Sequence, residues 1–331
     1  MRSLDPIEAA WLECVREMAA AGRAAATPLL GSAAGRAILG RGAGGDNTIE
    51  IDRAAEQVIL AVLARRAAAP YAVVSEEFGF GNGAAGAAAV AAGAADVTWR
   101  VLVDPVDGSL NAKRGLEPCC AAIAVASGDE MADVRVALVL DYARGHSFVA
   151  VRGAGMVTSR SLEGLEGAEP IEVLLLEAGR PDRHTFAYRD LALLAGAPGS
   201  AEMRVRQIGS LALSLCHVAT GVADVLLAPV PSRAVDIAAG LLILVEAGGG
   251  FAALDGTDMR RQPLDLERRA PFVAWRRGLD GDTVAGRARE LFGTSAPSGA
   301  GPAGLSGAST AARRRRGRTP ARRGPGLPSI H

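Results

Sequence analysis

Two aspartates at the end of an apolar run are the first residues of this chain that indicate chemistry. The run at 101–103 continues as DPVDGS, so Asp104 and Asp107 stand three residues apart. Pro105 has no amide hydrogen and should end the strand ladder, and the glycine after the second acid permits a tight turn. We expect both carboxylates to face one space, with the main-chain carbonyl of Val106 free between them.

The serine that follows this turn can begin a helix, whose first amides would point outward as hydrogen-bond donors. Carboxylate oxygens beside such donors suit a divalent cation together with a phosphate group. A capped turn with two solvated aspartates explains the same residues, and this stretch alone leaves both interpretations open.

Two more acids lie in a similar setting. The letters SEE at 75–77 place Glu76 at the end of the apolar run 71–74, and Asp236 lies in RAVDIAAG at the start of an apolar helix. A solvated strand end and a helix N-cap are the simpler interpretations, although an unpaired buried charge is costly and needs partners. A shared metal ion is the alternative. Because the donors are acid oxygens without Cys or His, that ion would be Mg²⁺.

A site of this kind could hydrolyse a phosphate ester without a cysteine or histidine nucleophile. Two cations about 4 Å apart can activate a water molecule and stabilise the leaving oxygen of an in-line displacement. The charge of the transferring phosphoryl group is spread over its oxygens, so cations and amides do most of the stabilising.

Apolar periodicity predicts the elements that must position these acids. Helices and strands are mixed along the chain, which favours a layered α/β or α+β fold with two sheets and helices between or around them. A glycine-rich loop is expected at 31–46 and a low-complexity connector at 79–96. Helices are predicted at 6–30, 48–67, 186–195, 210–220, 234–247 and 281–292, and strands at 71–74, 99–103, 119–126, 134–141, 146–151, 171–177, 222–227 and 271–275.

The 331 residues are 49% apolar, which is enough for a large core and excludes a fully disordered chain. We expect an N-terminal lobe at 1–150 with the metal-binding motifs, a C-terminal lobe at 151–293 that completes the site, and a disordered Arg-rich tail at 294–331.

Without the seven arginines at 313–323, the chain has 29 basic and 36 acidic residues. That acidic body argues against a fold that coats nucleic acid, which is expected to bind only nonspecifically through the tail.

The four cysteines show neither a zinc spacing nor a disulfide framework, which predicts a protein of the reducing cytoplasm. Charged residues interrupt the first apolar segment, and no run of about 18 apolar residues has membrane character, so neither a signal peptide nor a membrane span is expected. The expected partner is a small phosphate ester rather than a membrane.

Three motifs resemble those of the inositol monophosphatase superfamily of metal-dependent, lithium-sensitive phosphatases. They are SEEFG, DPVDGSLN and RAVDIAAGLLILVEAGG, and the resemblance spans about residues 5–293. It is closest to the archaeal-type branch, which hydrolyses both inositol-1-phosphate and fructose-1,6-bisphosphate, because GDNTIEID and RVRQIGSLALSLCHVATG fit that branch. The resemblance implies an αβαβα sandwich of the sugar-phosphatase type and a homodimer.

The resemblance also implies two Mg²⁺ sites made of oxygen ligands. Glu76, Asp104 and the carbonyl oxygen of Val106 would hold the first ion. Asp104, Asp107 and Asp236 would hold the second, so that Asp104 bridges the two ions.

Catalytic roles follow from the same resemblance. Asp52 and Ser109 would form the pair that orients the attacking water. Asp46 and Asp52, together with Glu76, are candidates for a third, weaker ion. The loop that contains Asp46 and Thr48 resembles the mobile catalytic loop of the family.

On the substrate side, the resemblance implies that Gly108 and Ser109 bind phosphate through their main-chain amides and the serine hydroxyl. Pro229 stands where animal-type enzymes carry a glutamate that contacts inositol, and Ala112 replaces the aromatic residue that usually follows the motif asparagine. Four further residues lie where the family's substrate-side residues fall: Arg206, Gly209, Ser210 and Arg233. The alternatives are that the two arginines lie on the surface and that the serine is a helix N-cap.

These observations predict Mg²⁺-dependent hydrolysis of a small polyol or sugar phosphate monoester by a metal-activated water. Inositol-1-phosphate and fructose-1,6-bisphosphate are the leading substrates. A related phosphatase of the same superfamily, acting on 3′-phosphoadenosine 5′-phosphate or histidinol phosphate, is the alternative. A different class of protein, a metal-stabilised scaffold whose Arg-rich tail binds nucleic acid, also fits the composition.

Overall fold

The described part of the chain belongs to one unit. Contacts divide the chain into Met1–Ala296 and Pro297–His331, and every described residue lies in the first of these units. The Arg-rich tail expected at 294–331 lies outside the described residues, apart from its first two, and the division into lobes at 1–150 and 151–293 stays a prediction. The computed structural model describes residues 2–83, 99–159, 170–177, 188–195, 203–267 and 269–295.

A seven-stranded sheet supplies two of the acidic strand ends. Its order is β4-β3-β5-β6-β7-β8-β9; β3 and β5 run parallel, and the other neighbouring pairs run antiparallel. Parallel neighbours bring their carboxyl ends to the same edge of a sheet, so the acids after β3 and within β5 come together. The strands are β3 (Tyr71–Ser75), β4 (Gly79–Gly83), β5 (Trp99–Asp107), β6 (Cys120–Ala126), β7 (Val134–Asp141), β8 (Ser147–Val151) and β9 (Gly155–Thr158).

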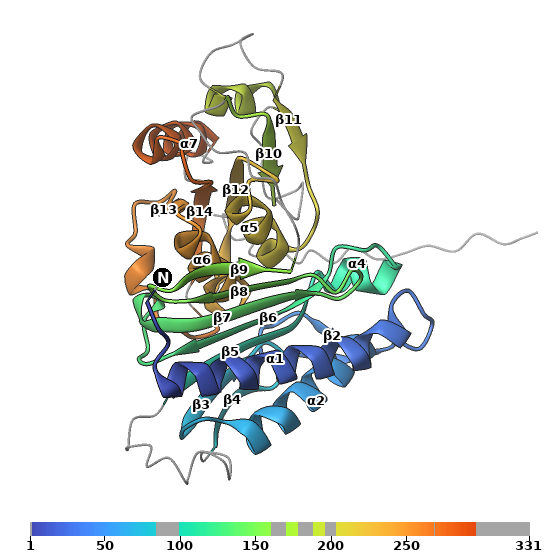
Figure 1. Ribbon diagram of the computed structural model, residues 1–331. Coiled ribbons are helices and arrows are strands. Elements are labelled where there is room, and N and C mark those ends of the chain that lie inside the picture. The colour runs from blue at the N-terminus through green and yellow to red at the C-terminus, as the bar shows by residue number, and fades with distance from the viewer. Residues whose placement is uncertain are drawn as a thin grey trace, which may run out of the picture. The chain divides into compact units, whose positions relative to one another are not determined.

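Helices α1 (Pro6–Ala26) and α2 (Glu50–Arg66) pack against each other and cover one face of this sheet (Figure 1). Helix α1 begins at a capping box, in which the Asp5 carboxylate accepts a hydrogen bond from its third helical residue. Its apolar stripe, which includes Trp11 and Met18, is fully buried. This packing fixes α2, whose first turn carries Asp52.

A five-stranded sheet of order β11-β10-β12-β14-β13 forms the second strand layer. Helices α5 and α6 lie between the two sheets, and α7 packs on the outer side of the five-stranded sheet (Figure 1). The layers therefore alternate, which confirms the predicted αβαβα sandwich. The elements are β10 (Val173–Leu176), β11 (Arg204–Arg206), α5 (Leu211–Ala219), β12 (Val225–Arg233), α6 (Ala234–Glu246), β13 (Gly250–Ala253), β14 (Arg269–Trp275) and α7 (Gly281–Ser295).

Helix α6 is apolar on nearly all sides because it is covered by a sheet on each side. Ile237, Leu241, Ile243 and Leu244 are at most 2% exposed, as expected for a helix in a central layer. No helix among the described residues combines the length and the apolar character that crossing a bilayer requires. Because α6 is buried, a charged residue in its first turn needs partners at that end of the helix.

Short strands are where the structure departs from the predicted elements. The loop expected at 31–46 contains β1 (Ile38–Arg41), which pairs with β2 (Asn47–Ile49) in a two-stranded ribbon. The connector expected at 79–96 begins as strand β4, and the sequence patterns do not predict β9, β11 or β13. These segments are too short or too rich in glycine for alternation to be visible. The remaining elements are η1 (Thr27–Leu29), α4 (Ser109–Arg114), η2 (Met131–Asp133), η4 (Tyr188–Ala195) and η5 (Met259–Arg261).

Candidate active site

A bulge in β5 turns both motif aspartates toward the same side of the sheet. Asp104 of β5 pairs with Ala122 of β6, and Asp107 pairs with Cys120. Three residues along β5 therefore correspond to two residues along β6. Side chains alternate along a regular strand, and the extra residue returns the second acid to the face of the first. The prediction that Pro105 ends the strand is wrong: the proline lies within the bulge, where its missing amide hydrogen breaks no ladder bond.

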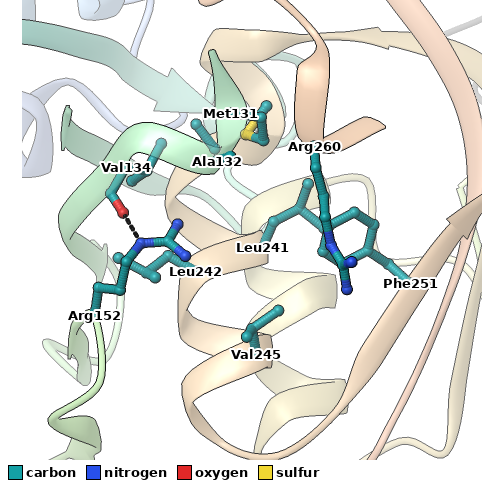
Figure 2. A pocket seen from close by; sticks show the side chains of 10 residues that line it. Met131, Ala132, Val134, Arg152, Leu241, Leu242, Val245, Phe251 and Arg260 are labelled. Carbon is teal, nitrogen blue, oxygen red and sulfur yellow. Dashed lines mark hydrogen bonds between the residues drawn. The ribbon is translucent and has the colours of Figure 1, made fainter. Parts of the chain in front are cut away.

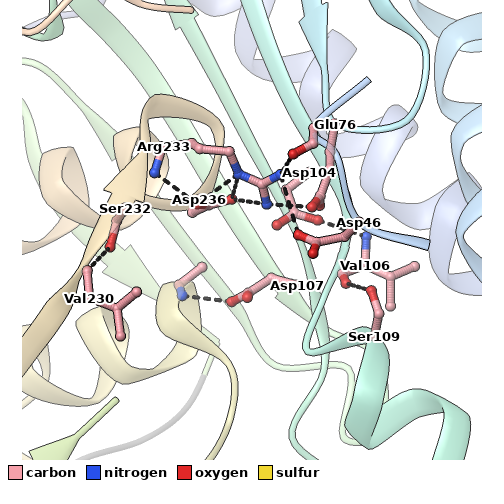
Figure 3. Close-up of polar contacts among 12 residues, drawn as sticks. Asp46, Glu76, Asp104, Val106, Asp107, Ser109, Val230, Ser232, Arg233 and Asp236 are labelled. Atoms are coloured by element: carbon pink, nitrogen blue, oxygen red, sulfur yellow. Dashed lines mark hydrogen bonds and ion pairs between the residues drawn. The ribbon is translucent and has the colours of Figure 1, made fainter. Parts of the chain in front are cut away.

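Three acids from three elements meet beside this bulge (Figure 3). Glu76 follows β3, Asp104 lies in β5, and Asp236 lies in the first turn of α6. One carboxylate oxygen of each lies within 4.8 Å of the other two, a spacing that lets one cation contact all three. The structure thus gathers three of the four predicted acidic ligands into one cluster, and Asp107 is not a member of it.

Burial opposes the ionisation of these acids. It raises the pKa of Glu76 to about 8, against the attraction of the Arg233 guanidinium. Burial raises the pKa of Asp104 well above its usual range, and the charges of Glu76 and Asp107 add to the rise. Burial also raises the pKa of Asp107 to about 6, although hydrogen bonds to its carboxylate offset part of this effect. Crowded, buried carboxylates of this kind attract any cation that can reach them.

Asp107 points toward the central helix layer. Its Oδ2 accepts hydrogen bonds of 2.7 Å from both the main-chain N of Ala212 and the hydroxyl of Ser210. Ser210 is the N-cap residue of α5 by position, but its hydroxyl serves Asp107, and Asp107 is the acceptor for the helix amide. The Sγ of Cys120 lies 3.9 Å from the same carboxylate oxygen, and burial raises the thiol pKa well above its usual range, so this thiol stays neutral.

Asp52 and Ser109, the predicted water-orienting pair, lie side by side. The Ser109 Oγ is 3.1 Å from Asp52 Oδ1 and 2.8 Å from the carbonyl oxygen of Val106. The single hydroxyl hydrogen serves one of these acceptors at a time. The Val106 carbonyl, predicted to be free, therefore has Ser109 as a hydrogen-bond partner, and it is released from that bond when Ser109 donates to Asp52 instead. Burial raises the pKa of Asp52 to about 7.

The loop between β1 and β2 is tied to the turn that carries the glutamates. The main-chain N of Gly44 donates to the carbonyl oxygen of Glu76 at 2.7 Å. The Thr48 hydroxyl donates to the carboxylate of Glu77, a neighbour of the cluster rather than a member. Thr48, predicted to be catalytic, therefore anchors the loop in this structure.

Arg233 lies among the acids (Figure 3). It is 7% exposed, and its guanidinium contacts the carboxylates of Asp236 and Glu76. Its Nη1 is 3.8 Å from a carboxylate oxygen of Asp46, whose side chain is largely exposed. Burial lowers the pKa of the guanidinium, but the charges of Asp236 and Glu76 outweigh it and raise the pKa above its usual value. The alternative of a surface arginine is therefore wrong for Arg233.

The other predicted substrate-side residues differ in their surroundings. Gly108 is the N-cap of α4 with φ 90°, and a Cβ there would lie 2.7 Å from the carbonyl oxygen of Pro118. Gly209 also has a positive φ, 74°, just before α5. Arg206 is exposed on β11 and donates to the carbonyl oxygen of its neighbour Val205 at 2.9 Å. Only glycine fits readily at the first two positions, whereas Arg206 keeps the surface setting of the simpler alternative.

A buried glutamate outside the predicted site residues supports the Glu76 turn. Glu56 of α2 is 8% exposed and accepts hydrogen bonds from the Ser75 hydroxyl and, at 2.9 Å, from the main-chain N of Phe78. These two donors flank the turn, so Glu56 fixes the direction in which Glu76 leaves β3.

A second such glutamate supports the start of α5. Glu177 follows β10 and accepts hydrogen bonds from the main-chain N of Ile208 and Gly209, each at 3.1 Å, and from the Ser214 hydroxyl at 2.8 Å. Burial raises the pKa of Glu177 to about 7. The signal that could have found it is the one that marks Asp236: an acid that directly adjoins an apolar run.

A separate hollow of about 210 Å³ lies along the later part of α6, beyond its acidic first turn (Figure 2). Its walls are mainly aliphatic, with two arginines at the edge, and the residues that line it include no carboxylate. A metal-dependent reaction therefore belongs to the acid cluster and not to this hollow. The lining residues are Met131, Ala132, Val134, Arg152, Ala238, Leu241, Leu242, Val245, Phe251 and Arg260.

The acid cluster offers oxygen ligands alone, which suits a hard cation. A sequence profile described as the inositol monophosphatase family matches residues 11–290, most of the chain. The chain belongs to the inositol monophosphatase family. Members of this family are metal-dependent phosphatases, so the prediction of a phosphoric monoester hydrolase is confirmed.

Similarity to named inositol monophosphatase family members extends over most of the chain. Nus factor SuhB of Xylella fastidiosa is 31% identical over 217 residues, which are 65% of this chain and 72% of that protein. Fructose-1,6-bisphosphatase/inositol-1-monophosphatase of Archaeoglobus fulgidus is 28% identical over 239 residues, which are 71% of this chain and 82% of that protein. This relative supports the archaeal-type branch that the motifs indicate.

A solved structure shares the fold of this inositol monophosphatase family member. The crystal structure of the MJ0109 gene product, titled inositol monophosphatase-fructose 1,6 bisphosphatase, has a TM-score of 0.67 at 21% identity. The match covers 85% of this chain and 99% of that one. At this level of identity the likeness shows the layered fold.

Proposed function

We propose that this phosphatase hydrolyses small polyol or sugar phosphate monoesters, with Mg²⁺ as its metal and inositol-1-phosphate and fructose-1,6-bisphosphate as substrates. The single observation that carries the metal dependence is the convergence of Glu76, Asp104 and Asp236. The name of the Archaeoglobus fulgidus relative supports the two substrates. A cytoplasmic homodimer is part of the proposal; the four free, buried cysteines suit a reducing compartment.

In this proposal Glu76, Asp104 and the Val106 carbonyl hold one Mg²⁺, and Asp104, Asp107 and Asp236 hold another. Bound Mg²⁺ would supply a Lewis acid for the phosphate oxygens and for the attacking water. Asp107 would bind through Oδ1, because its Oδ2 already accepts two hydrogen bonds from the start of α5. The main-chain amides at the start of α4 would receive the phosphate oxygens.

Asp52 and Ser109 would manage the proton of the attacking water. The Ser109 hydroxyl would accept a hydrogen bond from that water and pass its own hydrogen toward Asp52 Oδ1, 3.1 Å away. A carboxylate with a pKa of about 7 is suited to accept a proton near neutral pH. Asp46, in the loop between β1 and β2, and Thr48, in β2, would also act in the activation of this water.

Phosphate release from inositol-1-phosphate and fructose-1,6-bisphosphate, measured side by side with Mg²⁺ and with EDTA, tests this proposal. We expect turnover that disappears in EDTA and returns with Mg²⁺, and the ratio of the two rates ranks the substrates. Parallel assays with 3′-phosphoadenosine 5′-phosphate and histidinol phosphate cover the alternative within the superfamily. If only 3′-phosphoadenosine 5′-phosphate or histidinol phosphate is hydrolysed with Mg²⁺, the two substrates proposed here are wrong. Turnover that EDTA leaves intact would overturn the metal dependence.

A second candidate function concerns the Arg-rich tail. Seven arginines at 313–323 without a neighbouring acid would attract a polyanion such as nucleic acid, and a relative carries the name Nus factor SuhB. Deleting residues 294–331 separates the two functions. Unchanged phosphate release with lost RNA binding would support both, and unchanged RNA binding would remove the tail from this role.

A further inference from the structure

The guanidinium of Arg233 is held by the carboxylates that the proposed function assigns to the metal (Figure 3). Its Nη2 donates to Glu76 and, at 2.8 Å, to Asp236. Its Nη1 donates to the carbonyl oxygen of Gly44 at 3.2 Å. The residue is 7% exposed, so water screens these contacts only weakly. A buried arginine therefore already supplies one positive charge to the acid cluster.

The hydrogen bonds of Asp236 are nearly all used by this one residue. Its Oδ1 accepts from Arg233 Nη2 at 2.8 Å and from Nε at 3.1 Å, and its Oδ2 accepts from the main-chain N of Arg233 at 2.9 Å and from Nε at 3.1 Å. Nε carries a single hydrogen, which the two oxygens share, so three hydrogens of Arg233 serve about four lone-pair positions of the carboxylate. A cation that binds Asp236 therefore competes with Arg233 for the same carboxylate.

Asp104 has a different kind of partner. Its Oδ1 accepts a hydrogen bond of 3.0 Å from the main-chain N of Val106, within the β5 bulge. That contact orients the carboxylate and does not neutralise it, and the charge of Arg233 also acts on Asp104. Direct contact with the guanidinium concerns Glu76 and Asp236, the other two members of the cluster.

We propose that Arg233 is an internal counter-cation, which binds Glu76 and Asp236 in the metal-free protein and leaves them when a divalent cation binds. This inference rests on the proposed function, since it takes the same acids as metal ligands. A buried acid cluster without any cation is strongly unfavourable, so Arg233 stabilises the metal-free fold. By linkage, it also raises the metal concentration needed to fill the site.

The displacement of Arg233 also reaches the β1–β2 loop. Its Nη1 contacts the Gly44 carbonyl and lies 3.8 Å from Asp46, and both residues belong to this loop. A guanidinium that leaves Glu76 and Asp236 cannot keep all of these contacts in place. Metal binding and the position of the loop are therefore linked through one side chain.

Titration calorimetry of Mg²⁺ into the full chain, stripped of metal with EDTA and dialysed, tests the competition. We expect Arg233→Met to bind Mg²⁺ at least about tenfold more tightly than the native chain and to unfold at a lower temperature in EDTA. Arg233→Lys keeps the charge without the planar fork and should fall between the two. The matched control is Arg65→Met. It removes an exposed arginine of α2 that pairs with Glu17 of α1, and it should leave Mg²⁺ affinity unchanged.

A measurement on the native chain covers the case in which Arg233→Met does not fold without metal. With arginine labelled by ¹⁵N, the buried Nε–H groups of Arg233 and Arg276 should exchange slowly with water, and the Arg233→Lys spectrum identifies the first. Arg276 is 2% exposed, follows β14 directly and pairs with Asp224 at 2.5 Å, so it serves as an internal reference. Adding Mg²⁺ should shift or remove the Arg233 signal and leave the Arg276 signal in place.

The outcomes separate this inference from the proposed function. Mg²⁺ binding that is equal in the native chain and in folded Arg233→Met, or an Arg233 signal that ignores saturating Mg²⁺, would overturn the counter-cation and leave the metal site standing. No Mg²⁺ binding by either protein would overturn both. Binding by Arg233→Met that is tighter than that of the native chain supports both.

Discussion

The Asp107 carboxylate accepts a hydrogen bond of 2.7 Å from the main-chain N of Ala212, and so joins the end of β5 to the start of α5. One residue thus serves the seven-stranded sheet, the central helix layer and the proposed metal site. The bulge at Pro105 makes this possible, because it turns Asp107 to the face on which α5 lies.

Substitution of Asp107 should separate its catalytic role from its structural one. Asp107→Asn keeps an oxygen for Ala212 and loses a charged metal ligand, so phosphate release should fall by more than about 100-fold with unfolding free energy little changed. Asp107→Ala should also remove the helix cap and cost about 1 kcal/mol in urea denaturation. Native turnover in Asp107→Asn would remove this residue from the site.

Ser109 and Asp52 should act as a unit. Ser109→Ala and Asp52→Asn should each lower kcat by about 100-fold or more, because either change breaks the route of the proton from water to carboxylate. The double variant should be no slower than the slower single variant. Steady-state kinetics of all four proteins make up the cycle. Effects that multiply would mean that the two side chains act independently.

Gly108 should tolerate no side chain. Gly108→Ala places a Cβ 2.7 Å from the Pro118 carbonyl oxygen at φ 90°, which should lower the unfolding free energy by roughly 1–3 kcal/mol and reduce turnover as α4 shifts. The matched control is Gly286→Ala on α7, where a Cβ meets nothing within 4 Å. Urea denaturation should show that the control gains about 0.5–1 kcal/mol. A neutral Gly108→Ala would contradict the strain argument.

The buried acids predict that the chelated protein loses stability as pH rises. Burial raises the pKa of Glu76 to about 8 and those of Asp52 and Glu177 to about 7. Each acid holds its proton more firmly when folded, so its contribution is complete below the unfolded pKa and is lost as pH rises through the folded one. We expect the Tm in EDTA to fall between about pH 5 and 8, and Mg²⁺ to reverse most of that fall.

Glu177→Gln is the control for this pH dependence. Glu177 accepts hydrogen bonds from Ile208, Gly209 and Ser214 and is no proposed metal ligand, so its replacement should flatten part of the slope and spare the response to Mg²⁺. The part removed should reach roughly 2.5 kcal/mol between pH 5 and 8, from a pKa raised to about 7. A Tm in EDTA that rises over this range would contradict the argument.

The sequence by itself determined which acids stand at the ends of which elements and, through the family resemblance of their motifs, the class of reaction. Apolar runs of strand length lead into Glu76 and Asp104, and an apolar helix begins at Asp236, because these patterns depend only on neighbours along the chain. The same local signals predict the long helices and most central strands, and with the family resemblance they give the layered sandwich. Short glycine-rich strands such as β1 and β4 carry too little pattern to be seen.

Only the tertiary structure decided which of these residues meet. Glu76, Asp104 and Asp236 form one cluster while Asp107 turns to α5, and Arg233, weighed from sequence as a substrate-side residue or a surface arginine, lies among the acids. These relationships join positions far apart in the chain, such as Glu76 and Arg233, which are separated by 157 residues. They follow from one bulge in β5 and from the packing of α6 against the sheet. Pro105 marks a break in the strand and the apolar pattern of α6 marks a buried helix, but neither local pattern says which acids meet.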